Sequence, residues 1–123
     1  MKYTYGFEKL TVWQDARDLT KMVYAISNKL PTSEMYGLSN QMKRAAISVV
    51  SNIAEGSGRA TLKDQANYYQ IAFSSIIELI NQVIICNDLG FISDEETVLL
   101  RNEIEKVSNK LNALRRSRIN KLP

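Results

Sequence analysis

The stretch from residue 41 to residue 59, QMKRAAISVVSNIAEGSGR, decides how the chain is organised. Its apolar side chains recur at spacings of three and four residues, which is the pattern of one buried helix face. They are Met42, Ala45, Ala46, Val49, Val50 and Ile53. Small residues are dense here, so we expect another helix to approach closely. Residues 55–59 hold two glycines and are predicted to end the helix, because glycine adopts positive φ without strain.

Similar patterns on both sides of this stretch predict three more helices. Upstream, an apolar seam with heptad spacing ends at Pro31. Its members are Val12, Ala16, Leu19, Val23, Ile26 and Leu30. Downstream, an apolar run predicts a long helix that is buried on most of its circumference. Thr61 and Asp64 have the spacing of a capping box at its start, and Gly90 is the glycine expected at its C-terminal cap. Ser93 and Glu96 form a capping box that begins the last helix. We therefore expect helices at about 12–30, 38–55, 62–89 and 94–117.

The first ten residues, MKYTYGFEKL, alternate aromatic and polar side chains. Such alternation is typical of a short strand, but no second strand is predicted to pair with it. We expect instead an extended arm that lies on the helical body. Thr11 and Gln14 have the spacing of a capping box, so Thr11 is predicted to be the N-cap of the first helix.

Length and composition favour one helical domain, residues 1–123. Two prolines and five glycines are too few for an all-β protein with many turns or for a disordered chain. The predicted fold is all-α, an antiparallel up-down-up-down four-helix bundle with a short extended N-terminal arm. The apolar faces of the first and third helices exceed what one bundle needs. Trp13, Met22 and Tyr24 belong to this excess, which the arm or another subunit is expected to cover.

The available residue types limit catalysis. The chain has no histidine, the usual general base at neutral pH, and it lacks the Glu-x-x-His pairs of di-metal bundles. Its one cysteine, Cys86, lies in an apolar run and is expected to be buried and inert. Glu78 is expected to be exposed or ion-paired, and Glu55 to be structural and to pair with a nearby cation. We expect no enzymatic activity, no cofactor and no metal.

Neither a signal peptide nor a stretch long enough to span a membrane is evident, so the expected location is the cytoplasm and no membrane partner is expected.

The net charge is +3, and six of the basic residues form two clusters. The first contains Lys43, Arg44 and Arg59, and the second contains Arg115, Arg116 and Arg118. The functional interpretation is that both clusters contact nucleic-acid phosphates without reading the base sequence. The alternatives are a solvated helix face for the first cluster and a complement to the helix dipole for the second. No aromatic residues are interleaved in the first cluster, so no base-stacking platform is predicted there. The glycines before Arg59 lack the spacing of a phosphate loop.

Several motifs resemble those of one bacterial family. VWQ at 12–14, QMKRAA at 41–46, SNIAEGSGR at 51–59 and LGFI at 89–92 resemble its VWQ, QMRRAA, SNIAEG-x-GR and LGYL motifs. This is the four-helix bundle protein family, known from reading frames in intervening sequences of 23S ribosomal RNA genes. The accessory variability protein of diversity-generating retroelements is a relative. Lys43 stands where the family has arginine, which keeps the charge but loses the planar fork.

The resemblance implies a four-helix protomer, a homopentamer, a basic surface and no enzymatic activity. In the retroelement branch it also implies binding to a reverse transcriptase and to nucleic acid. We therefore predict a homo-oligomer that binds RNA or DNA non-specifically through the two basic clusters. The alternative is an accessory or scaffold subunit whose main partner is a protein such as a reverse transcriptase, with charge serving only solubility.

Overall fold

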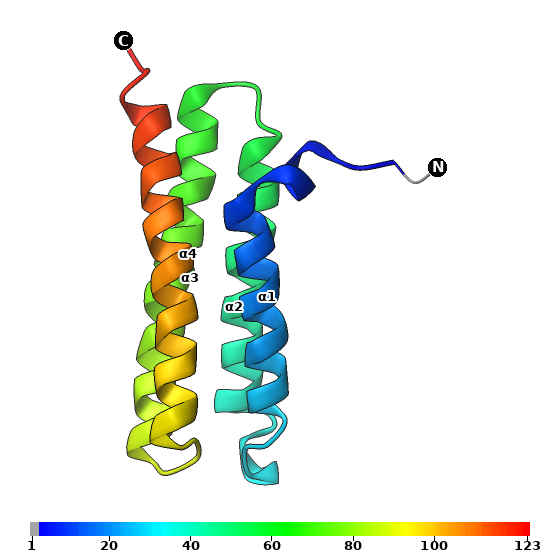
Figure 1. The fold of residues 1–123 in the computed structure, drawn as a ribbon, viewed down its shortest axis with the longest axis vertical. Helices are drawn as coiled ribbons and strands as arrows, with labels where there is room; N and C mark the ends of the chain where they lie inside the picture. The colour runs from blue at the N-terminus through cyan, green and yellow to red at the C-terminus, as the bar shows by residue number, and fades with distance from the viewer. Residues whose placement is uncertain (1–2) are drawn as a thin grey trace.

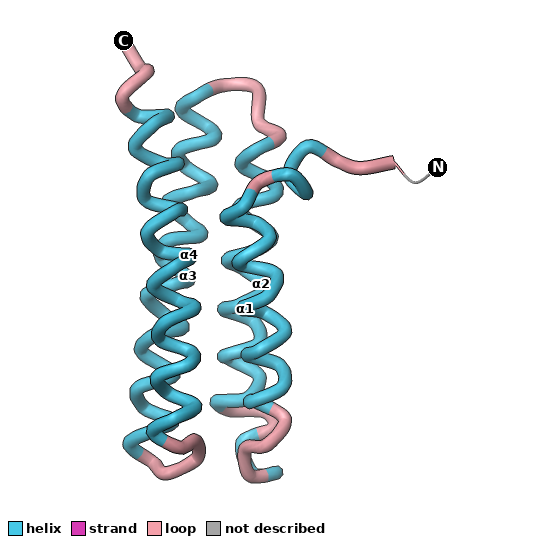
Figure 2. The backbone as a smooth tube through the Cα atoms, in the orientation of Figure 1, coloured by secondary structure: helices cyan, strands magenta, loops and turns pink. Residues whose placement is uncertain are grey.

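Four α-helices make up most of the protein, whose computed structural model describes residues 3–123. They are α1 (Thr11–Ser27), α2 (Leu38–Ser57), α3 (Leu62–Asp88) and α4 (Asp94–Ile119). Consecutive helices run in opposite directions along one long axis (Figure 1). Short 3-10 turns, η1 (Gly6–Lys9) and η2 (Thr32–Glu34), precede α1 and α2. Residues 3–123 contain no strand (Figure 2), and the predicted four-helix bundle is confirmed.

The core between the helices contains the residues that periodicity predicted. The seam of α1 is buried along its whole length, and the apolar face of α2 is buried except for Val50, which is half-buried. Tyr69 of α3 is the largest fully buried side chain, with 1 % of its surface exposed. Cys86 is also buried, and its Sγ lies 3.4 Å from Sδ of Met42. The expectation of a buried cysteine is confirmed.

Helix α2 ends within residues 55–59 as predicted, at Ser57 rather than at Glu55, but the predicted reason is wrong because no glycine there has a positive φ. The helix continues through Gly56 to Ser57, and Gly58 has an ordinary φ of −93°. Gly56 is buried because α3 packs directly on it. A Cβ atom at this position would lie 2.7 Å from Cε1 of Tyr69. The only positive-φ glycine among residues 3–123 is Gly90, at 77°, directly after the last turn of α3, as predicted for a helix stop.

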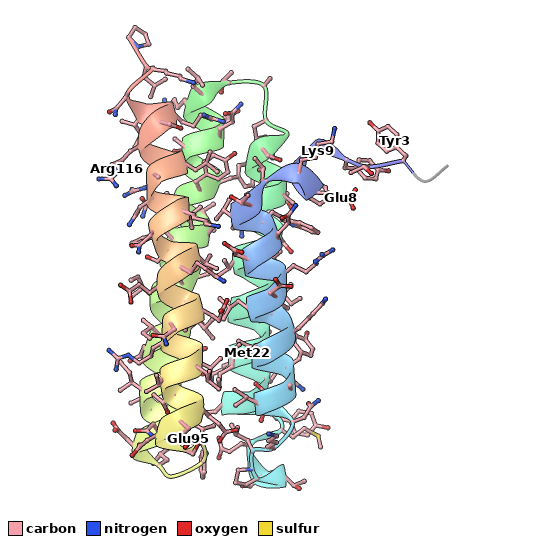
Figure 3. All side chains as sticks on the ribbon, viewed as in Figure 1. Tyr3, Glu8, Lys9, Met22, Glu95 and Arg116 are labelled. Atoms are coloured by element: carbon pink, nitrogen blue, oxygen red, sulfur yellow. The ribbon has the colours of Figure 1, made fainter. Side chains whose placement is uncertain are left out.

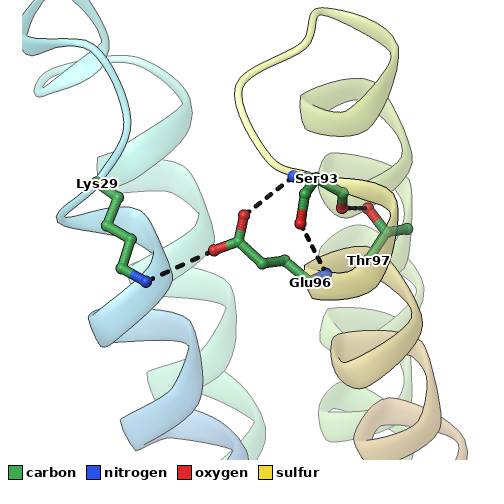
Figure 4. A network of polar contacts seen from close by, with 4 residues as sticks. All are labelled: Lys29, Ser93, Glu96 and Thr97. Carbon is green, nitrogen blue, oxygen red and sulfur yellow. Dashed lines mark hydrogen bonds and ion pairs between the residues drawn. The ribbon is translucent and has the colours of Figure 1, made fainter.

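Side-chain caps begin the last two helices as predicted. Thr61 Oγ1 accepts a hydrogen bond from the Asp64 backbone N–H at 3.1 Å. At α4, Ser93 Oγ accepts from the Glu96 N–H, and the Glu96 carboxylate accepts from the Ser93 N–H, both at 3.0 Å (Figure 4). The second Glu96 oxygen lies 3.7 Å from Lys29 Nζ, which connects α4 to the chain just after α1.

The first helix is shorter than predicted at its C-terminal end. It stops at Ser27, and Leu30 N–H donates to Ser27 O in a tight turn. Pro31 disfavours helical geometry only in Leu30, and the three residues before it leave the α-helix through tight turns, in which Lys29 N–H donates to Ile26 O at 3.0 Å.

The N-terminal segment also differs from the prediction. Thr11 is the first helical residue rather than the N-cap, which is Leu10. Residues 3–5 are extended, but Gly6–Lys9 form η1 instead of continuing the extended arm. The Phe7 ring packs edge-on against Trp13 at 5.0 Å between centroids, so the arm does cover part of the excess apolar surface. Tyr3 lies on the portion that projects from the bundle (Figure 3).

The long helix α3 is less buried within one chain than predicted. Four of its isoleucines remain between 38 % and 53 % exposed, namely Ile71, Ile77, Ile84 and Ile85. On α4, Val98 and Leu99 are exposed, and the neighbouring Leu100 is the buried residue.

The helix α3 is long and apolar enough to cross a membrane, with a mean hydropathy of 1.4 over an 18-residue window. The expectation that no stretch is long enough was therefore wrong on length and composition. The buried face of this helix packs against α2 and α4, as the core helix of a bundle does.

Candidate functional site

Lys43 and Arg44 lie in the first half of α2. Lys43 Nζ donates to Asn28 Oδ1 at 2.8 Å and lies 5.2 Å from the centre of the Tyr24 ring. The ammonium is thus held against the end of α1. Arg44 is exposed and lines an open groove between α2 and α3 together with Glu78. This pair of cations is therefore partly engaged within the protein.

Arg59 lies beyond the opposite end of α2. At a rise of about 1.5 Å per residue, the helix between Arg44 and Ser57 spans about 20 Å. The structure therefore does not bring Arg59 together with Lys43 and Arg44 within one chain. The first basic cluster of the sequence is two separate sites.

Arg59 instead joins the C-terminal cluster. Gln65 Nε2 donates to the Arg59 carbonyl oxygen at 2.9 Å, while Gln65 Oε1 accepts from Arg118 Nε at 2.7 Å. The Arg59 guanidinium lies 4.4 Å from the centre of the Tyr68 ring and donates to the Tyr68 hydroxyl. This hydrogen bond raises the pKa of Arg59, which is charged at neutral pH in any case.

Arg115 and Arg116 extend the same region along α4. Arg115 donates to Gln70 of α3 and lies 5.5 Å from the centre of the Phe73 ring. Arg116 is exposed and points away from the bundle (Figure 3). We call Arg59, Arg115, Arg116 and Arg118 the basic end. Within residues 3–123 none of these four has a carboxylate within 4.0 Å, since the ion pairs there are Lys29–Glu96, Lys106–Glu103 and Lys110–Asp15.

A cavity of about 420 Å³ opens beside the basic end. Tyr5 and Phe7 of the N-terminal segment form one wall, and Tyr69 and Arg118 contribute from α3 and α4. Burial raises the pKa of the Tyr69 phenol, and the nearby Arg118 guanidinium partly opposes this shift. Sequence reasoning missed this cavity. The aromatic alternation of residues 3–7 was its signal, but it was interpreted as an extended arm that only covers the helical body.

Glu55, Glu78 and Cys86 are the other ionisable residues that the sequence singled out. Glu55 was expected to pair with a nearby cation, but it forms no ion pair in the described part of the chain. Glu78 is exposed, as expected, and accepts a hydrogen bond from Gln82 at 3.2 Å. Burial raises the pKa of the Cys86 thiol. Among residues 3–123 no three metal-ligating side chains of the His, Cys, Asp or Glu type converge.

A family model described as the 23S rRNA-intervening sequence protein matches residues 8–113. The chain belongs to this family. Among solved structures it is similar to the crystal structure of a protein with unknown function from the S23 ribosomal protein family of Bacteroides thetaiotaomicron VPI-5482. That match has a TM-score of 0.79 and 17 % identity, and covers 84 % of this chain and 96 % of the other. At this identity it shows the fold alone. No curated protein matches the chain.

In this member of the 23S rRNA-intervening sequence protein family, the SNIAEGSGR motif has a structural explanation. Asn52 Nδ2 donates to Ser48 O at 2.8 Å, on the side of α2 that faces α3. Gly56 leaves room for the Tyr69 ring because it has no side chain, and the Arg59 guanidinium lies over the Tyr68 ring. The motif thus positions the first turns of α3 and the basic end that depends on them. Neither the family description nor that of the structural neighbour names a catalytic activity.

Proposed function

We propose that the protein is a non-enzymatic homo-oligomer that binds RNA or DNA non-specifically through its basic end. The observation that carries this proposal is the gathering of four arginines from two distant segments at one end of the bundle. None of them forms an ion pair with a carboxylate of residues 3–123, although the charges of Glu55 and Asp64 act on Arg59. Guanidinium groups suit phosphate oxygens because their planar fork donates two parallel hydrogen bonds.

The apolar surface of α3 supports the self-association. Ile77 and Ile84 are seven residues apart and share one face, while Ile71 and Ile85 share another. Two different exposed patches on one chain suit a head-to-tail contact, which closes into a ring when the rotation allows it. Five copies is the number that the family resemblance implies. The basic end lies apart from the centre of α3, so several copies can present it together.

Substitution of exposed arginines tests the location of the binding surface. Arg59 and Arg116 are exposed, so the double variant Arg59→Gln/Arg116→Gln removes two charges from the basic end. We expect it to weaken binding of a labelled RNA or DNA oligomer on the order of tenfold or more in anisotropy titrations at low salt, through lost counterion release. Lys43→Gln/Arg44→Gln removes the same charge at the other end of α2 and serves as the matched control. Equal weakening by both variants would contradict a localised surface.

The exposed isoleucines of α3 favour a second candidate function, because they also suit contact with a protein partner. In that case the chain is an accessory or scaffold subunit, for example of a reverse transcriptase, as the family resemblance implies for one branch. This function predicts no affinity for nucleic acid even at low salt. The same titration therefore separates the two functions.

A further inference from the structure

The cavity beside the basic end combines aromatic walls with a single cation. Four chain segments contribute to it: the N-terminal segment, the end of α2, the first turns of α3 and the last turn of α4. Its volume of about 420 Å³ lies in the range of small-molecule sites, about 300 to 1,000 Å³. A single charged or aromatic group of nucleotide size therefore fits such a space.

The aromatic wall formed by Tyr5 and Phe7 belongs to a row of three rings on the N-terminal segment. Tyr5 stacks on Phe7 with an interplanar angle of 11° and a centroid distance of 6.0 Å. Tyr3 meets Tyr5 edge-on at 4.9 Å on the outer side. Tyr5 is nevertheless 59 % exposed, so much of its surface stays available to a ligand. The η1 turn fixes the backbone of Tyr5, because the Glu8 carboxylate accepts the Tyr5 backbone N–H at 2.7 Å.

The cation of the cavity is held by neutral groups. Arg118 Nε donates to Gln65 and Nη1 donates to Ser117 Oγ at 2.9 Å. These bonds orient the guanidinium without neutralising it, and no carboxylate of residues 3–123 pairs with it. The chain also carries no acid after Glu105. An anionic ligand with a flat ring matches this combination of groups.

We propose that this cavity receives one unpaired nucleotide of a single-stranded nucleic acid, with its base against Tyr5 and its phosphate against Arg118. The inference builds on the proposed function and deepens it. Base stacking on an aromatic ring is independent of sequence, because every base has a π-face. A paired base inside a duplex cannot reach the ring. The protein therefore prefers single strands to duplexes of equal charge.

The test compares two labelled probes of about 12 nucleotides, an oligothymidylate and an abasic oligomer of the same length and charge. The wild-type protein is expected to bind the oligothymidylate on the order of tenfold more tightly. Tyr5→Ala should remove that preference and leave affinity for the abasic probe unchanged. Tyr5→Phe keeps the ring and should keep the preference. Tyr36→Ala removes an 89 % exposed tyrosine at the other end of the bundle and should change nothing.

Four outcomes would overturn the proposal. Equal wild-type affinity for the two probes would exclude stacking while leaving phosphate binding by the basic end intact. A preference that survives Tyr5→Ala would place the base elsewhere. Dissociation of the oligomer by Tyr5→Ala, seen by light scattering, would assign the ring to a second copy of the chain. Absence of binding to both probes at about 50 mM salt would reject the proposed function itself, and this proposal with it.

Discussion

At the scale of single residues, Gly56 shows how one missing side chain sets the spacing of two helices. It lies inside α2, where glycine ordinarily costs about 0.5–1 kcal/mol relative to alanine because of its backbone entropy. Yet a Cβ here would lie 2.7 Å from Tyr69 and 2.9 Å from Cβ of Tyr68. The close approach outweighs the helix propensity, since the Tyr69 ring is fully buried and has little room to move.

Gly56→Ala should therefore destabilise the protein, against the direction that helix propensity predicts. We expect a loss of about 1–3 kcal/mol in the free energy of unfolding, the usual cost of overpacking a core. Gly58→Ala is the matched control, because its Cβ would meet only Glu55 O at 3.7 Å, an ordinary contact. Urea unfolding of both variants measures the difference. A Gly56→Ala variant as stable as the wild type would refute the packing explanation.

The same glycine shows why part of the sequence prediction failed. A glycine after a helical stretch can mark either positive φ or a close approach, and the local sequence is the same in both cases. Gly90 is the first kind and was predicted correctly. Gly56 is the second kind, and the neighbour that decides it, Tyr69, lies on the next helix.

At the scale of elements, the start of α4 is secured by a reciprocal cap and an ion pair. Glu96 accepts from the Ser93 N–H and lies 3.7 Å from Lys29 Nζ (Figure 4). The Ser93 backbone hydrogen bond lowers the pKa of the Glu96 carboxyl, with a smaller contribution from the Lys29 charge. A lowered folded-state pKa means that ionised Glu96 stabilises the fold.

This stabilisation should depend on pH with a definite sign. Above the ordinary glutamate pKa of about 4.3 the carboxylate is ionised in both states and its contribution is complete. As pH falls through the lower folded-state pKa, the contribution is lost. Glu96→Gln should thus be less stable than wild type near neutral pH, and the deficit should shrink below about pH 4. Urea unfolding at several pH values measures this. A deficit that stays constant with pH would mean that the charge has no role.

Element boundaries and caps were predictable where the signal is local. Ser93 with Glu96, and Thr61 with Asp64, are short patterns whose partners lie within one turn, and both form. Thr11 has the same spacing to Gln14 but does not cap α1. Its partner Gln14 instead donates to the Glu8 carbonyl at 2.8 Å, because η1 folds back before the helix.

At the scale of the whole molecule, the isoleucines that α3 leaves exposed are unusual for a protein that stays monomeric. Large contiguous apolar patches mark interaction sites in soluble proteins. Ile77 is 53 % exposed, and its face of α3 also carries Ile84. The proposed oligomer covers these side chains.

Ile77→Glu should therefore break the assembly while leaving the bundle folded, because a charge buried at the contact is costly and a charge on a free surface is not. Five protomers of 14.0 kDa would give wild type a mass of about 70 kDa by light scattering, and the variant should approach the protomer mass. Met35→Glu, on the exposed turn between α1 and α2, is the matched control. A wild-type protein of protomer mass would refute self-association.

The candidate site was predictable only in part, because its geometry joins distant segments. The basic character of residues 115–118 is evident in the sequence. Their association with Arg59 runs through Gln65, which is 53 positions from Arg118 and carries no charge. The separation of Lys43 and Arg44 from Arg59 follows from the length of α2, which the sequence predicted to within about two residues.

The salt dependence of nucleic-acid binding tests the central claim most directly. Binding of a labelled RNA or DNA oligomer is measured between about 50 and 200 mM salt. Phosphate contacts by the basic end predict a steep linear fall of log affinity with log salt, with a slope that Arg59→Gln/Arg116→Gln makes shallower by about 2 per protomer engaged. An affinity that is absent at about 50 mM salt, or a slope that the substitutions leave unchanged, would contradict binding through the basic end.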